Sequence, residues 1–354
     1  MVSQAKGIDN YDLSETLKII PDLTPDRYKG QNGKVAVVGG SFDYTGAPYY
    51  AGISALKGGG DLSHIFCTEM AGIPIKCYSP ELIVHNSLVS SEKYTEEEFD
   101  QKKKDEAVAK ITKWFDAMHT FVLGPGLGRD PILGKYLHEV LAAIKDKSTV
   151  VFDGDMLWYL SDSTERKGIL EVLKKIAPRT VLTPNKVEFS RLCKTYLPEE
   201  QLVPDVERSK AKKDIESTGK EVIEVDLGHP YVVDAVKLSK VLYNATVCYK
   251  GEFDVITDGK RALVVKQQGA KKRCGGQGDI FSGLMGLYVY WSNQFWEKEV
   301  KSDDESRVMR GCVLASVITR LAANKAYQKH QYGLTTPLII EQIPDVIDQL
   351  ASSK

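Results

Sequence analysis

Short apolar runs recur along the chain and alternate with longer segments in which apolar residues return with the period of a helix. The runs are rich in β-branched and aromatic residues, which is typical of strands buried on both faces of a sheet. They cover residues 35–38, 62–67, 82–85, 121–124, 150–153, 181–183, 222–225 and 246–249. The helical segments cover residues 47–56, 96–118, 131–144, 164–176, 186–196, 231–243, 279–290 and 307–326.

This alternation predicts an α/β fold with a mostly parallel central sheet and helices on both faces. In such sheets, ligands bind beyond the carboxyl ends of the strands. Residues 1–29 are polar and mixed, with a short helix expected over residues 11–20. We therefore predict an N-terminal extension over residues 1–29 and one domain over residues 30–354. The polar stretches 90–104 and 198–220 indicate solvated helices or loops rather than a domain boundary.

The composition is that of an ordinary globular protein, with 42% hydrophobic and 27% charged residues among 354. A net charge of −1 provides no basic surface for nucleic acid or an anionic membrane. No apolar run approaches the roughly 20 residues that span a bilayer. The six cysteines are scattered without metal-ligand spacing, which favours free thiols in a reducing compartment. The first 15 residues are acidic and lack the apolar segment of a secretory signal, so a soluble cytoplasmic protein is expected.

The sharpest motif is Cys-Gly-Gly-Gln-Gly-Asp at residues 274–279, directly before an apolar helix. Its glycines allow successive amides to converge, and the helix N-terminus adds partial positive charge, which predicts an anion hole for a transferring phosphoryl group. Asp279 at its mouth suits a base that accepts a proton from an attacking hydroxyl. The basic run Lys271, Lys272 and Arg273 could pair with phosphates. The alternative is a helix-capping Asp beside a solvated basic loop.

Two further motifs follow apolar runs. Residues 124–129, Gly-Pro-Gly-Leu-Gly-Arg, form a glycine turn that is neither a Walker P-loop nor a dinucleotide fingerprint. It could admit a ligand or serve only as a tight turn. Asp153 and Asp155 end another run, and such paired carboxylates suit a magnesium–phosphate or hydroxyl contact, although Asp is common in turns.

Three more segments carry candidate ligand contacts. Asn185 and Glu188 have the spacing of a helix capping box, and could also bind ligand or a metal-bound water. Lys250 and Gly251 could meet a nucleotide phosphate or base, or could belong to a plain hairpin that returns through residues 255–259. The glycines and hydroxyls of residues 39–48 could admit a substrate closely or act as turn and capping residues.

In this order, the motifs resemble the NAD(P)H-hydrate dehydratase family of the ribokinase-like superfamily, in its eukaryotic, ATP-using branch. The matching segments are GKVAVVGGSFDYTGAPYYAGISALK, IKCYSPELIVH, VLGPGLGRD, VLTPNKVEFSRL, YKGEFDVITDG and RCGGQGDIFSG, which span roughly residues 30–330. Six collinear motifs argue against chance agreement. The resemblance implies a ribokinase-like fold and a lyase that uses ATP and Mg²⁺. The enzyme would phosphorylate the ring hydroxyl of hydrated NADH or NADPH and then eliminate phosphate, which restores the cofactor.

The resemblance also implies site residues. Asp279 matches the catalytic Asp and contacts the hydrate. The other hydrate-binding positions are Gly126, Asn185, Lys186, Val187, Glu188, Phe189, Ser190 and Arg191. The ATP-binding positions are Lys250, Gly251, Glu252, Phe253, Asp254, Gly269, Ala270, Lys271, Lys272, Arg273, Cys274, Gly275, Gly276, Gln277 and Gly278. Mg²⁺ is expected near Asp153, Asp155 and Glu188.

Three other functions compete with this interpretation. A vitamin or sugar kinase of the same superfamily would stop at the phosphorylated product. A non-catalytic nucleotide-binding or scaffold protein would leave Asp279, the glycine loop and the basic run without a joint purpose. An oxidoreductase would need the dinucleotide fingerprint that this sequence lacks. The chain shows no companion epimerase domain, so a separate hydrate epimerase is the expected functional partner, and an assembly of identical copies stays open.

Overall fold

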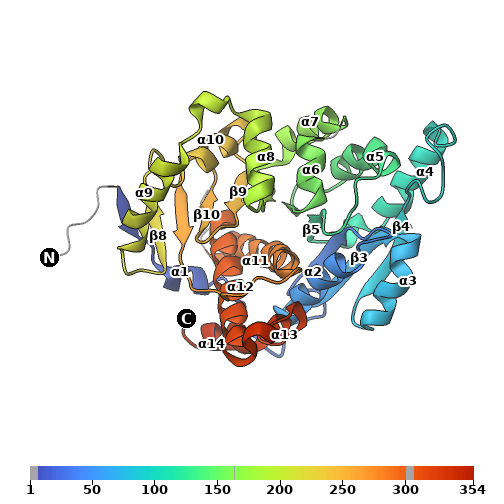
Figure 1. Cartoon of the computed structure of the whole chain (residues 1–354). Coiled ribbons are helices and arrows are strands. Elements are labelled where there is room, and N and C mark those ends of the chain that lie inside the picture. The colour runs from blue at the N-terminus through green and yellow to red at the C-terminus, as the bar shows by residue number, and fades with distance from the viewer. Residues whose placement is uncertain (1–6, 163, 300–306) are drawn as a thin grey trace.

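The computed structural model describes residues 7–162, 164–299 and 307–354, and these form a sheet of 11 strands with helices on both faces (Figure 1). The strand order is β1-β8-β11-β10-β9-β7-β6-β5-β2-β3-β4. The strands are β1 (Ile8–Asn10), β2 (Lys34–Val38), β3 (Leu62–Thr68), β4 (Ile83–Leu88), β5 (Thr120–Leu123), β6 (Thr149–Phe152), β7 (Thr180–Leu182), β8 (Val222–Val225), β9 (Thr246–Tyr249), β10 (Asp254–Thr257) and β11 (Ala262–Val265).

The strands from β9 to β4 in this order run parallel, and those from β9 to β1 pair antiparallel. The predicted mostly parallel sheet is therefore confirmed. Nearly every residue of β2, β5, β6 and β7 is buried, because helices cover both faces and leave no solvent side for alternating polar residues.

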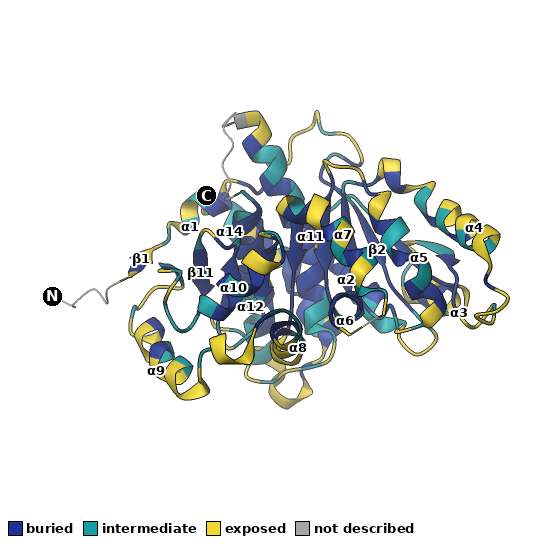
Figure 2. Ribbon diagram, turned by 90° about the horizontal axis from the view of Figure 1, so that it is seen from above, coloured by how far each residue is buried: buried dark blue, intermediate teal, exposed yellow. Residues whose placement is uncertain are grey.

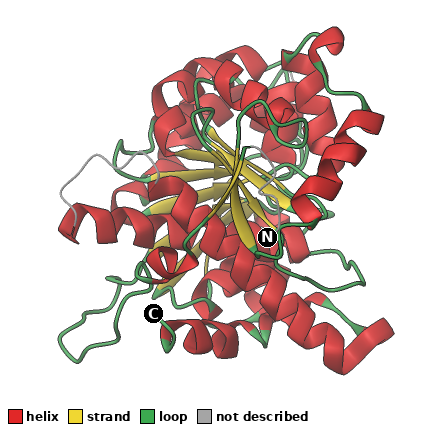
Figure 3. Ribbon diagram, turned by 90° about the vertical axis from the view of Figure 1, so that its left-hand side faces the viewer, coloured by secondary structure: helices red, strands yellow, loops and turns green. Residues whose placement is uncertain are grey.

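The helices form two layers, seen above and below the strands in Figure 3. The helices α2, α11 and α12 pack on one face, and α5, α7, α8 and α10 pack on the other. The bounds are α1 (Leu13–Leu17), α2 (Gly46–Lys57), α3 (Glu69–Tyr78), α4 (Gln101–Thr112), α5 (Pro131–Ala142), α6 (Asp155–Ser161), α7 (Arg166–Ile176), α8 (Lys186–Tyr196), α9 (Asp205–Glu216), α10 (Val233–Val241), α11 (Gln277–Glu299), α12 (Arg307–His330), α13 (Thr336–Ile340) and α14 (Ile343–Ala351).

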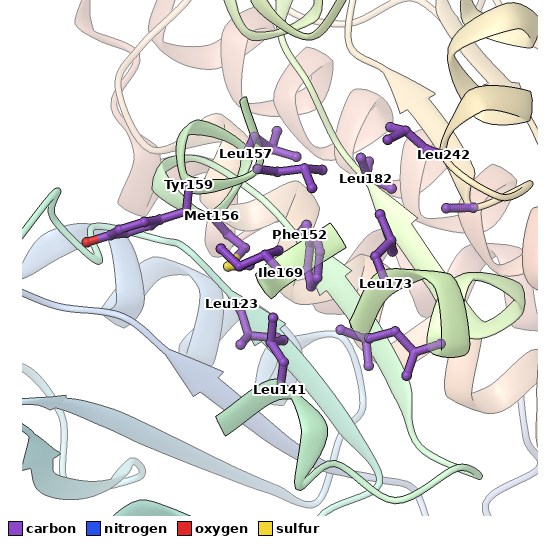
Figure 4. Packing of buried hydrophobic residues seen from close by; sticks show 14 of the residues in the cluster. Leu123, Leu141, Phe152, Met156, Leu157, Tyr159, Ile169, Leu173, Leu182 and Leu242 are labelled. Carbon is purple, nitrogen blue, oxygen red and sulfur yellow. The ribbon is translucent and has the colours of Figure 1, made fainter. Parts of the chain in front are cut away.

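Part of the core lies where β5, β6 and β7 end (Figure 4). Leu123, Phe152 and Leu182 are the last residues of these strands, and they pair in register across the sheet. All three are fully buried, and they pack with Ile169 and Leu173 of α7. Since side chains alternate along a strand, the residue after each of these three is directed toward the opposite face, which α11 covers.

The structure differs from the predicted elements mainly outside the parallel strands. Residues 8–10 form β1, which pairs with β8 and joins the N-terminal segment to the sheet, while α1 is shorter than the expected helix over residues 11–20. The polar stretch 198–220 contains α9, which buries Ala211 and Ile215 and exposes its other side (Figure 2). The division at residues 29 and 30 stays a prediction. Within the described ranges, no helix is both long enough and apolar enough to cross a membrane.

Candidate active site

The carboxyl ends of the parallel strands bring the predicted polar residues to one edge of the sheet. Backbone hydrogen bonds link the segments that follow the strands. The amides of Gly124, Asp153 and Thr183 each donate at 3.0 Å to the carbonyl that ends the neighbouring strand, and the Lys250 amide donates to Pro184 at 2.8 Å. Gly124 is required here, because its φ is +117° and a Cβ would lie 1.7 Å from the Asp153 carbonyl oxygen.

Beyond this edge, three side chains meet on the α11 face of the sheet. Asp153 is only 3% exposed, and Thr183 is fully buried. The Thr183 hydroxyl donates to Asp153 Oδ1 at 2.7 Å, and Lys250 Nζ donates to the same oxygen at 2.7 Å. A carboxylate this deeply buried is stable only when it is paired, and these two donors provide the pairing.

The glycine loop meets this group from the other side. Gly276 has a φ of +97°, and a Cβ there would lie 2.7 Å from the Tyr50 ring and 2.9 Å from Thr336. The Thr336 hydroxyl donates to the Gly275 carbonyl and so holds the loop. The long helix α11 begins at Gln277, and the amides of a first helical turn have no partners within the helix. The structure thus brings the loop to a helix N-terminus, the setting in which anions commonly bind, and the anion hole at this point stays a prediction.

Asp279 lies in the first turn of α11, and its pKa is raised to about 7. Burial is the main cause, the charge of Asp153 adds to it, and the Lys250 ammonium opposes it. A carboxyl group that titrates near neutral pH can take up and release a proton under physiological conditions.

Lys250 contributes a buried cation to the site. Burial disfavours its charge, but Asp153, Glu188 and Asp279 outweigh this effect and raise the pKa of Lys250, so the ammonium stays charged. A Cβ added to Gly278 would lie 3.4 Å from Lys250 Nζ, so the ammonium lies directly beside the glycine loop.

A cavity of about 740 Å³ opens in front of the loop and contains most of the predicted ATP-binding positions. Those that line it are Lys250, Gly251, Glu252, Phe253, Asp254, Gly269, Ala270, Lys271, Arg273, Cys274, Gln277 and Gly278. Lys272 is directed away, since its ammonium donates to the carbonyls of Tyr332 and Leu334. The cavity wall also includes residues that the sequence did not single out, namely Lys266, Gln267, Gln268, Phe281, Thr319, Arg320 and Ala323.

Arg320 of α12 organises one wall of this cavity. Its guanidinium donates to both carboxylate oxygens of the buried Asp254, at 2.8 and 2.6 Å, and the Ser316 hydroxyl donates to the same carboxylate at 2.6 Å. Arg320 also donates to the carbonyls of Gly251 and Glu252, at 3.1 and 2.9 Å. The Gly251 amide also donates to the Asp254 carboxylate at 3.2 Å. Arg320 and Asp254 together therefore stabilise the turn over residues 251–254.

The predicted hydrate-binding residues divide between two cavities and the core. Asn185 and Lys186 line the large cavity, and Lys186, Val187, Ser190 and Arg191 line a neighbouring one of about 530 Å³. Phe189 is instead buried, and its ring stacks on Tyr249 with the centroids 4.4 Å apart. The Gly126 carbonyl accepts hydrogen bonds from the Gly40 amide at 3.0 Å and the Ser41 hydroxyl at 3.1 Å, so it connects two glycine turns.

The three carboxylates expected near Mg²⁺ each have other partners. Asp153 is held by Thr183 and Lys250, and Glu188 closes a capping box, in which it accepts from the Asn185 amide at 2.8 Å. Asp155 accepts from the Gly128 amide at 2.9 Å and pairs with Arg129 at 3.3 Å, which shapes the glycine turn after β5. Across the residues that the structure describes, no three His, Cys, Asp or Glu side chains gather as a metal site. These carboxylates are engaged with protein donors rather than gathered into a cluster, and a Mg²⁺ position near them stays a prediction.

Comparison with known proteins identifies the family. A family model described as NAD(P)H-hydrate dehydratase matches residues 35–345. The ATP-dependent (S)-NAD(P)H-hydrate dehydratase of Mus musculus is 36% identical over 333 residues, which cover 94% of this chain and 83% of the mouse protein. The protein of the same name from Physcomitrium patens is 38% identical over 338 residues, which cover 92% of both chains.

Solved structures show the same fold at lower identity. A ribokinase-like superfamily protein from Enterococcus faecalis has a TM-score of 0.65 and 18% identity, with 96% of this chain and 95% of that chain covered. The ADP/ATP-dependent NAD(P)H-hydrate dehydratase of Bacillus subtilis, co-crystallised with ATP and Mg²⁺, has a TM-score of 0.60 and 17% identity, with 98% of this chain and 100% of that chain covered. The expected ribokinase-like fold is thereby confirmed. On the extent of these matches, the chain belongs to the NAD(P)H-hydrate dehydratase family.

Proposed function

We propose that this enzyme carries out the ATP-dependent dehydration of the (S)-hydrates of NADH and NADPH, and so repairs damaged nicotinamide cofactors. In the first step the ring hydroxyl attacks the γ-phosphorus of ATP, ADP leaves, and the hydroxyl proton passes to a base. In the second step the carbon–oxygen bond breaks, phosphate departs, and a neighbouring ring carbon loses a proton. Phosphorylation is needed because hydroxide is a poor leaving group and phosphate is a good one.

The observation that carries this proposal is the position of Asp279. Asp279 lies in the first turn of α11, directly after Gln277 and Gly278, which line the large cavity, and the Lys250 ammonium acts on its carboxyl group electrostatically. A base at this point can take the hydroxyl proton while the loop amides and the Lys250 ammonium stabilise the charge of the phosphoryl group. The pKa of about 7 lets Asp279 do this without a large energetic penalty in either protonation state.

The two cavities support a division of the substrates. We assign ATP to the large cavity, which the predicted nucleotide-binding residues line, and the hydrate to the region of Gly126 and α8. Asn185 and Lys186 belong to the predicted hydrate-binding set and also line the large cavity, which supports adjacent sites for the two substrates.

Mg²⁺ is the expected companion of ATP, and the Bacillus subtilis relative was co-crystallised with both. When bound, the ion neutralises part of the phosphate charge. The carboxylates of Asp153, Asp155 and Glu188 are already engaged with protein donors, so they do not fit as a ready-made site. The steps above are therefore assigned to this chain's own residues.

We propose that a separate epimerase supplies the (S)-hydrate. A cytoplasmic location and an assembly of identical copies stay predictions from the sequence. A kinase that stops at a stable phosphomonoester is the alternative function, since it would need the same base and anion hole.

One assay separates these functions. Hydrated NADH is incubated with the enzyme and ATP, ADP or no nucleotide, and products are followed by the absorbance of reduced nicotinamide and by inorganic phosphate. We expect both to appear together with ATP, in equal amounts. Accumulation of a phosphorylated hydrate without phosphate release would establish the kinase instead, and no consumption of ATP would reject both.

A further inference from the structure

The buried group of Asp153, Thr183 and Lys250 is not explained by the reaction steps alone. Asp153 Oδ1 accepts two hydrogen bonds of 2.7 Å, one from the Thr183 hydroxyl and one from Lys250 Nζ. The Asp153 and Lys250 side chains are 4% and 19% exposed. The three residues come from the ends of β6, β7 and β9, so the parallel sheet itself sets their spacing.

Lys250 has other carboxylates within electrostatic reach, namely Asp279 and Glu188. A lysine side chain has four flexible carbon–carbon torsions, and an untethered ammonium would turn toward whichever carboxylate is nearest. If it paired with Asp279, it would neutralise the base that the reaction needs. In the structure the Lys250 ammonium instead donates to Asp153 and lies beside Gly278 of the glycine loop.

We propose that Asp153 and Thr183 are positioning residues, which hold the Lys250 ammonium where it meets the phosphoryl group that ATP transfers. Thr183 orients the Asp153 carboxylate, and Asp153 orients Lys250. A cation fixed in advance loses little conformational entropy when the phosphate arrives, and needs no reorganisation during transfer. This positioning role rests on the proposed function only for the identity of the reaction, and the binding of a nucleoside triphosphate can be measured independently of it.

Nucleotide affinity tests this arrangement without the hydrate. Calorimetry with Mg²⁺ compares a non-hydrolysable ATP analogue with ADP, which lacks the phosphoryl group in question. We expect wild type to bind the analogue more tightly than ADP. K250M should lose about tenfold in affinity for the analogue, which is the effect of removing one charged hydrogen bond. Its affinity for ADP should change by about twofold or less. Equal losses for both nucleotides, or a wild type without preference, would overturn the proposal.

Thr183 offers a matched pair of variants. T183V keeps the shape of the buried side chain and removes its hydroxyl, whereas T183S keeps the hydroxyl and removes a methyl group. We expect T183V and D153N to lose part of the preference for the analogue, and T183S to retain it. T180V is the control, because Thr180 is an equally buried threonine at the other end of β7, and its hydroxyl donates to Ile176.

A merely structural role for Thr183 would give the opposite order, with T183S more impaired than T183V or with T180V equally impaired, and would overturn the proposal. Turnover of hydrated NADH by wild type is measured in parallel. If wild type converts the hydrate while T183V keeps its full preference for the analogue, the positioning role fails and the function stands. If wild type leaves the hydrate unchanged while T183V and K250M lose the preference, the function fails and the positioning role stands.

Discussion

Asp279 shows how the surroundings of one side chain set its chemistry. An exposed Asp is ionised throughout the physiological range and is a weak base. At the start of α11, burial and the nearby Asp153 carboxylate raise the pKa to about 7, while Lys250 limits the rise. The charges of Glu188 and Asp155 also raise the pKa of Asp279, and the pKa of Tyr50 is raised mainly by burial, to which the charge of Asp279 adds. Asp279 can therefore exchange a proton with substrate near neutral pH.

This pKa predicts the pH dependence of catalysis. Only the ionised form of Asp279 can accept the hydroxyl proton, so kcat/KM should fall as the pH drops through about 7 and level off above it. Steady-state rates from about pH 5 to pH 9 test this, with enzyme preincubated at each pH and assayed at neutral pH as the control. A rate that stays constant down to about pH 5 would exclude Asp279 as the base.

The same shift predicts an effect on stability. The folded-state pKa of Asp279 lies above its ordinary value of 3.8, so ionisation opposes folding at high pH, and this cost disappears as the pH falls below the ordinary value. D279N removes the cost. We expect the variant to unfold at higher urea concentration than wild type at about pH 8, with the difference shrinking toward about pH 4.

D348N is the matched control, since Asp348 is exposed on α14, away from the site. It should leave the urea midpoint unchanged at both pH values. A D279N protein that is less stable than wild type at about pH 8 would contradict the assigned shift.

At the scale of elements, α12 supports the turn between β9 and β10. Arg320 reaches from the helix to Asp254 and to two carbonyls of residues 251–254. Its side chain is 15% exposed and that of Asp254 is 6% exposed, so the pair is largely shielded from water. Breaking such a pair leaves an uncompensated charge in the interior.

We expect R320M to lower the free energy of unfolding by about 3–5 kcal/mol, because the Asp254 carboxylate stays buried without its cation. Nucleotide affinity should fall as well, since the turn that lines the cavity loses its anchor. K325M on the same helix is the control. It removes an exposed ion pair with Asp345, and should cost about 1 kcal/mol or less. Urea unfolding measures the free energy of unfolding of both variants. Equal decreases for R320M and K325M would refute the role of Arg320.

The elements that the sequence predicted best are those with the clearest apolar run or capping motif. The parallel strands are continuous apolar runs, and α8 was predicted with the bounds that the structure shows, because its capping box marks the start. The helix α3 was missed since it contains Pro74, which normally signals a helix end. Strand β1 has only three residues, and its existence depends on pairing with β8 rather than on its own composition.

At the scale of the whole molecule, local motifs predicted which residues gather at the carboxyl edge of the sheet, but not every partner of those residues. Asp153 suggested a metal ligand because its sequence neighbour Asp155 is also acidic. The structure instead pairs Asp153 with Lys250, 97 residues later, and Asp155 with the turn after β5. Arg320 carried no local signal, since it lies within an apolar helix pattern and meets Asp254 only when α12 packs on the sheet. Contacts this distant depend on the strand order, which the pattern of apolar runs does not specify.

The proposed roles of Asp279 as base, of the glycine loop as anion hole and of Lys250 as cation are tested most directly with D279N. The measurement is the rate of ATP-dependent conversion of hydrated NADH to NADH by D279N and by wild type, with affinity for a non-hydrolysable ATP analogue determined on the same samples. We predict that D279N loses at least about a hundredfold in rate, as expected for removal of a general base, while the affinity changes little. A D279N enzyme that converts the hydrate at a rate near that of wild type would contradict the account.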